Sequence, residues 1–222
     1  MKRTVMLLSP LFLFLSSFSV FSQDMNANVK DQPTELVFSK TEKINVNYLY
    51  ELMDKGNYGT AQNFIKSNTL SKTIVIEILK KYANQGLTPA MWMLGEAYNS
   101  EKDSENTANW IYAALLGTRI DSSLCINRKA GGIEGIYAKS FSSAVQTART
   151  NRLTKPISFA IDLQKGIPVS SRKPQWVCSV VQHEKSRTGD GTLDSNKWGD
   201  IYKAQIEKFK NDTTTDQPVS PF

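Results

Sequence analysis

Apolar residues recur at helical spacing through most of the chain, and this spacing constrains the fold more than any other feature of the sequence. Residues three or four apart share one face of a helix. Glycines and capping residues bound the apolar stretches, as is typical of helix ends. We therefore predict an all-α protein of antiparallel helix pairs, similar to a short α-solenoid, with helices at 44–56, 57–67, 69–86, 88–100, 103–117, 132–152, 154–166 and 193–211.

Individual helix starts are also predicted. Thr88 is expected as an N-cap because Pro89 follows it at the first helical position. Asp103 or Ser104 is expected to cap the next helix. In the first helix, one face is expected to bury Ile44, Tyr48, Leu49, Leu52 and Met53.

Two apolar runs have the residue types of strands. For residues 73–78, the length of the capped segment around them favours a helix. For residues 175–181, "QWVCSVV", both a strand and a helix remain open.

The first 22 residues resemble a secretory signal peptide. Lys2 and Arg3 precede an apolar run from Val5 to Phe21, and Ser22 provides a small residue before a cut at Gln23. An uncleaved membrane anchor is the alternative, but Pro10 and several serines interrupt the apolar run, which would need about 18 continuous residues. The mature protein is expected in the periplasm or secreted, with a flexible leader at 23–43, a helical domain at 44–210 and a disordered tail at 211–222.

The charge of the mature chain excludes one class of partner. Without the signal peptide, 25 Lys and Arg stand against 21 Asp and Glu, a net charge of +4, and the basic residues are scattered. Nucleic-acid binding is therefore not expected, and neither is membrane binding after cleavage.

Glu51, Glu77, Glu96 and Glu105 are dispersed and are expected on solvated faces, which argues against a paired-carboxylate glycosidase site.

The two cysteines, Cys125 and Cys178, are predicted to form a disulfide because an exported chain meets an oxidising environment. Closing a loop of about 50 residues contributes on the order of 4 kcal/mol in the chain-entropy model. The competing interpretation pairs Cys178 with His183, the single histidine, as nucleophile and base. Five residues is a poor spacing for one helical face, so the disulfide is favoured.

The sequence offers little evidence for any other kind of catalytic or metal-binding site. One histidine and two paired cysteines do not make a zinc site, and no Gly-x-Ser-x-Gly motif is present. We predict no catalytic, metal-binding or cofactor-binding residues. A hydrolase with an unrecognised site that uses His183 is the alternative.

The stretch from Thr88 to Gly117 resembles one unit of the Sel1-like branch of tetratricopeptide repeats. Ala90, Leu94, Gly95 and Tyr98 match the first helix of such a unit. The second helix is matched by Ala108, Trp110, Ala113, Ala114 and Gly117. The turn between them lacks the usual glycine. The resemblance implies a repeat-like region at 44–118, followed by a different C-terminal part at 119–210.

The C-terminal part is similar to uncharacterised exported proteins of Gram-negative bacteria, through Cys125, the Trp176–Cys178 segment and Trp198. This second resemblance implies an exported protein but no known activity. The resemblance to Sel1-like repeats implies a periplasmic, non-enzymatic module that binds another protein, as an adaptor or as an immunity protein against a secreted bacterial toxin. An envelope protein that binds peptidoglycan or membrane is a third hypothesis.

The candidate partner-binding residues are aromatic, since stacked helix pairs present such side chains on a concave surface. Aromatic residues at helical spacing usually pack inward, so the same residues are also candidates for the core. They are Tyr48, Tyr58, Trp92, Tyr98 and Trp110.

Overall fold

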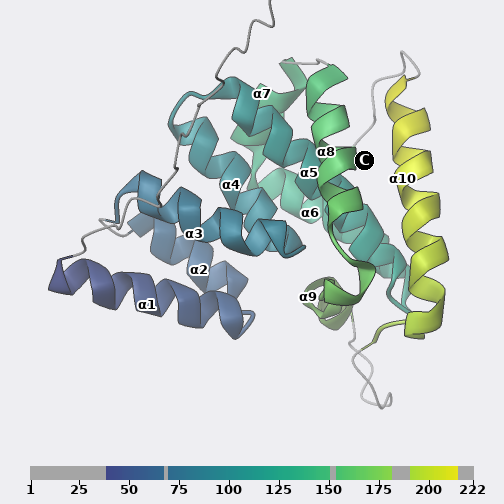
Figure 1. Ribbon diagram of the computed structural model, residues 1–222, viewed down its shortest axis with the longest axis horizontal. Coiled ribbons are helices and arrows are strands. Elements are labelled where there is room, and N and C mark those ends of the chain that lie inside the picture. Colours follow the sequence, from purple (N-terminus) through teal and green to yellow (C-terminus); the bar gives the residue numbers. More distant parts are fainter. Residues whose placement is uncertain (1–38, 68–69, 151–153, 182–190, 215–222) are drawn as a thin grey trace, which may run out of the picture. The chain divides into compact units, whose positions relative to one another are not determined.

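The computed structural model describes residues 39–67, 70–150, 154–181 and 191–214 (Figure 1). The predicted signal peptide and most of the predicted leader, up to residue 38, lie outside these residues. Within the described ranges, ten α-helices follow one another: α1 (Lys40–Asp54), α2 (Tyr58–Ser67), α3 (Lys72–Asn84), α4 (Thr88–Ser100), α5 (Ser104–Ser123), α6 (Ile133–Ser140), α7 (Ser142–Thr150), α8 (Thr154–Gly166), α9 (Gln175–Cys178) and α10 (Trp198–Thr214). In these residues β pairing is limited to one isolated bridge between Cys125 and Thr192, so the all-α prediction is confirmed.

Four short 3-10 helices join these elements within the described residues: η1 (Arg128–Gly132), η2 (Val169–Ser171), η3 (Ser179–Val181) and η4 (Ser195–Lys197). The run left open between strand and helix, residues 175–181, is therefore helical, as α9 and η3. Helix α5 continues six residues beyond Gly117 to Ser123, so the expected boundary of the repeat-like region at 118 falls inside a helix.

The ends of the helical domain lie further out than expected. Helix α1 begins at Lys40 because the hydroxyl of Ser39 accepts a hydrogen bond from the Glu42 amide, while the Glu42 carboxylate accepts one from the Ser39 amide. This capping box satisfies two amide groups that the helix leaves unpaired. At the other end, α10 runs to Thr214, into the segment expected as a disordered tail.

The predicted N-cap role of Thr88 is wrong. The N-cap of α4 is Leu87, and Thr88 is already helical. Its hydroxyl donates instead to the carboxylate of Asp121, at 2.6 Å. The cap predicted for α5 is correct at Asp103, whose carboxylate accepts from the Asn106 amide at 3.0 Å.

Helices α4 and α5 form an antiparallel pair at the centre of the core, which places Thr88 beside Asp121 and Trp92 beside Thr118. Small residues allow the close approach. A Cβ atom added at Gly95 would lie 2.6 Å from the Cδ1 atom of Ile111. The turn between the two helices holds Lys102 at φ 61°, a left-handed conformation that favours glycine.

The helix expected over 132–152 is divided at Phe141, which ends α6 with φ −111° and ψ 31°. The break turns the Phe141 ring inward. It stacks on Trp92, with ring centroids 5.5 Å apart, and is only 2% exposed. Aromatic packing thus overrides the continuous helical spacing of this stretch.

The expected apolar face of α1 is only partly correct. Leu49, Leu52 and Met53 are buried together with Val46, whereas Ile44 is 61% and Tyr48 is 42% exposed. Helix α1 packs on α2 at one edge of the fold (Figure 1), so a single side of it is covered.

Candidate functional site

A cavity of about 340 Å³ lies between α2, α3 and α4. Three helix faces form its wall, because the lining residues of each helix are spaced three or four apart. Phe141, turned inward at the break between α6 and α7, closes one side. The apolar part of the wall consists of Ile65, Leu70, Val75, Met93, Ala97 and Phe141.

Five polar residues also line the cavity: Gln62, Lys66, Lys72, Glu96 and Ser100. Lys72 is already paired, since its Nζ atom lies 2.5 Å from the Oε1 atom of Glu101, and both side chains are about half exposed. Lys66 is exposed to solvent. Cationic groups in this position are well hydrated and contribute little to any one interaction.

Glu96 differs from the lysines. Its Oε2 atom is covered from solvent and has no hydrogen-bond partner among the described residues. Glu96 as a whole is half-buried, so the expectation that it lies on a solvated face is only partly correct. A covered acceptor without a partner costs about 1–3 kcal/mol.

The five predicted aromatic residues do not form one surface. Trp92 is fully buried and Trp110 is 6% exposed, so both belong to the core. Tyr58 and Tyr98 are half-buried, and Tyr48 is exposed on α1, where its ring meets that of Phe64 edge to face. None of the five is among the residues that line the cavity. The helical spacing that suggested them reflects inward packing, as expected for most aromatics.

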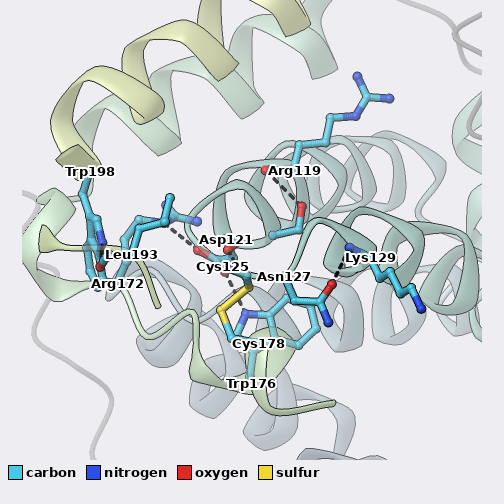
Figure 2. Close-up of a disulfide and its surroundings, with 11 residues drawn as sticks. Arg119, Asp121, Cys125, Asn127, Lys129, Arg172, Trp176, Cys178, Leu193 and Trp198 are labelled. Carbon is cyan, nitrogen blue, oxygen red and sulfur yellow. Dashed lines mark hydrogen bonds and ion pairs between the residues drawn. A yellow bond between two sulfur atoms is a disulfide. The ribbon is translucent and has the colours of Figure 1, made fainter. Parts of the chain in front are cut away.

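The predicted disulfide between Cys125 and Cys178 is confirmed. It belongs to a second, smaller cluster of buried residues with Trp176, Val177 and Ile133. Figure 2 shows the disulfide with Trp176 close to it. A sulfur in a disulfide is not a thiolate, so Cys178 is not a nucleophile in this state. His183 lies outside the described residues.

Two backbone hydrogen bonds form a second connection beside the disulfide, and nothing in the sequence predicted them. The amide of Ile126 donates to the Gly191 carbonyl at 2.9 Å, and the amide of Leu193 donates to the Leu124 carbonyl at 2.7 Å. The segment that leads into α10 is thereby held to the end of α5, next to Cys125.

A buried polar network lies beneath the disulfide. The Asp121 carboxylate accepts from Arg172 Nε at 2.7 Å, from Trp176 Nε1 at 2.8 Å and from Thr88. Arg172 also donates to the side-chain oxygen of Gln164 at 2.7 Å. All these groups are paired, so the network connects α4, α5, α8 and α9 and leaves no group free to act on a ligand.

Burial also changes the titration of a nearby tyrosine. The pKa of Tyr58 is raised to about 12, chiefly because burial disfavours the phenolate and also because Tyr137, Asp121 and Asp54 lie nearby. Tyr58 therefore stays neutral at physiological pH and takes part in packing, between the main core and the disulfide cluster.

Two further properties concern the described residues as a whole. No group of three or more His, Cys, Asp or Glu side chains in them is arranged to hold a metal ion. None of their helices is long and apolar enough to span a membrane.

Comparison of the chain with known protein families, curated proteins and solved structures finds no match. The kinship to Sel1-like repeats stays a prediction.

Proposed function

We propose that this protein is an exported, non-enzymatic module that binds another protein, and that the cavity between α2, α3 and α4 receives part of the partner. An adaptor and an immunity protein against a secreted bacterial toxin are two versions of this function. The observation that supports the proposal is the chemistry of the cavity: an apolar wall with a few polar side chains.

The residues of this wall are better suited to binding a partner than to catalysing a reaction. Apolar lining with a few placed polar groups is the usual composition of a binding site. The described lining residues include neither histidine nor cysteine, and the Ser100 hydroxyl donates its hydrogen bond to the Ala97 carbonyl. Burial of an apolar side chain of the partner against Ile65 and Ala97, the half-buried apolar residues of the wall, would contribute to the binding free energy.

This function is tested by comparing the proteins captured by the wild-type protein with those captured by a variant whose cavity is filled. The chain from Gln23 onward is immobilised and offered an envelope extract from its own host, and bound proteins are identified by mass spectrometry. The variant Ala97→Phe fills the cavity from α4. The matched control is Ala204→Phe, on the exposed side of α10 and away from the cavity.

We expect a near-stoichiometric partner that is retained by the wild-type protein and the Ala204→Phe control and is lost with Ala97→Phe. A partner that binds all three proteins equally would place the interaction elsewhere and refute the role of the cavity. The identity of the partner then separates the two versions: an immunity protein inhibits the purified toxin in a stoichiometric assay, whereas an adaptor leaves the activity of its partner intact.

A further inference from the structure

Aromatic side chains connect the cavity to the disulfide. Phe141, which lines the cavity, stacks on Tyr137 with ring centroids 6.1 Å apart. Tyr137 in turn meets Trp176 edge to face, with centroids 5.0 Å apart. Trp176 packs in the same buried cluster as Cys125 and Cys178 (Figure 2). Rings at these separations are in direct contact, so a displacement of Trp176 reaches the cavity wall through one intermediate ring.

A second connection runs along α2. Tyr58, the first residue of this helix, packs against the disulfide cluster as well as against the main core. Gln62, Ile65 and Lys66 lie on the same face of the helix and line the cavity. The wall that α2 provides is therefore positioned by a helix whose first turn contacts the disulfide cluster.

The disulfide is the covalent part of the attachment of α9 to α5. Beside it, the indole of Trp176 donates to the Asp121 carboxylate at 2.8 Å. Helix α9 has four residues, Gln175–Cys178, and a helix this short is not stable through its own backbone hydrogen bonds. Loss of the disulfide therefore lets α9 shift on α5, and the Trp176 ring shifts with it.

We propose that the disulfide sets the shape of the cavity through these aromatic contacts, and that the protein binds its partner in the disulfide form and not in the dithiol form. The inference rests on the proposed function, since it concerns the regulation of the same cavity. Binding would then start only after export, because disulfides form in oxidising compartments and are rare in the cytosol.

The oxidation is a thiol–disulfide exchange. The thiols of Cys125 and Cys178 together lose two protons and two electrons as the bond between their sulfur atoms forms. An oxidant of the thiol oxidoreductase class accepts them, and its own disulfide becomes a dithiol. In the folded protein Cys125 is 6% and Cys178 is 1% exposed, so a reductant has little access to the bond. The oxidation is therefore a step of maturation that is made once.

Hydrogen-exchange mass spectrometry tests the inference on the chain from Gln23 onward. The oxidised wild type is compared with the double variant Cys125→Ala, Cys178→Ala, and exchange is followed in α2, in residues 137–145 and in α8. Helix α8 is the reference, because its described residues neither line the cavity nor belong to the disulfide cluster. The control variant Ile206→Ala removes packing from the buried face of α10, away from both.

We expect the double cysteine variant to stay helical and to exchange faster in α2 and in residues 137–145, by about tenfold more than in α8. Ile206→Ala should instead raise exchange in α8 at least as much as in those two segments. Tyr137→Leu should raise exchange in residues 137–145 of the oxidised protein but add little to the double cysteine variant, since both changes break the same connection.

Binding is measured with the partner captured from the envelope extract. The double cysteine variant should bind it about tenfold more weakly, because the form that is competent to bind becomes the minor one. Ile206→Ala should bind it like the wild type.

Contrary results separate the inference from the proposed function. Exchange that rises evenly in all helices, or loss of the helical signal in circular dichroism, would show that the disulfide supports the whole fold and not the cavity, which overturns the inference. Unchanged binding of the partner by the double cysteine variant overturns it too, and both results leave the proposed function standing. Capture that survives Ala97→Phe refutes the proposed function, and the inference falls with it.

Discussion

Asp121 and Arg172, which are 51 positions apart, form an ion pair with side chains only 1% and 0% exposed. Asp121 is on α5, and Arg172 lies just after η2, in the loop between α8 and α9. The pair joins the C-terminal segment to the central helix through a route separate from the disulfide. Figure 2 shows both residues close to Cys125 and Trp176.

Removing one partner of this pair should be costly. The substitution Arg172→Met leaves the Asp121 carboxylate buried and without its counter-charge. We expect the free energy of unfolding to fall by about 3–5 kcal/mol, measured by urea denaturation. The neighbouring Lys173→Met, at an exposed position, is the control and should change it by less than about 0.5 kcal/mol. Equal effects of the two substitutions would mean that the pair contributes nothing.

Gly117 should not tolerate a methyl group. A Cβ atom there would lie 2.8 Å from the Thr88 hydroxyl and 3.1 Å from the side-chain nitrogen of Gln164, both of which are held in the buried network. We expect Gly117→Ala to reduce stability by about 1–3 kcal/mol. The control is Gly199→Ala, where a Cβ atom meets nothing within 4 Å. It should be neutral or stabilising by up to about 1 kcal/mol, and a stabilised Gly117→Ala variant would show that the helices move apart easily.

The disulfide should stabilise the mature protein measurably. The cysteines are separated by 53 positions, so the chain-entropy model predicts a loss of about 4 kcal/mol in the double variant Cys125→Ala, Cys178→Ala. Calorimetric melting compares this variant with the oxidised protein. Thiol titration of the denatured protein without reductant should detect no free thiol; two free thiols would contradict the bridge.

Alkaline pH should destabilise the fold through Tyr58. Its pKa is raised to about 12 in the folded protein, from about 10 in an unfolded chain. The unfolded state therefore loses its proton first, and the stability that the neutral form provides is present below pH 10 and is lost as the pH rises from about 10 to 12. Urea denaturation across this range should show a shallower decline for Tyr58→Phe. The same decline in both proteins would assign the effect to other groups, such as Tyr82, whose pKa burial also raises.

Local signals made much of the fold predictable. Gly56 and Gly86 adopt φ angles of 75° and 91° just beyond the ends of α1 and α3, as their positions after apolar helical stretches indicated. Asp103 caps α5 with its own carboxylate. These features depend on residues within one helical turn, which the sequence displays directly.

The candidate site was harder to predict from the sequence than the helix ends and caps were. The residues Met93, Glu96, Ala97 and Ser100 share one face of α4, a pattern visible in the sequence, but their spacing does not say whether that face meets core, solvent or a cavity. Glu96 was expected in solvent because charged residues usually are. In the structure it is half-buried and lines the cavity.

By itself, the sequence determined the helical class, the stops at Gly56 and Gly86, a cap at Asp103 or Ser104 and the pairing of its two cysteines. Tertiary structure decided the use of Thr88 as a donor to Asp121, the break at Phe141, the burial of Arg172 and the cavity beside Glu96. The physical reason is the separation along the chain between the residues that interact. Caps and helical faces arise from neighbours a few residues away, whereas the burial of a charge is stabilised only by partners that the fold brings from distant segments.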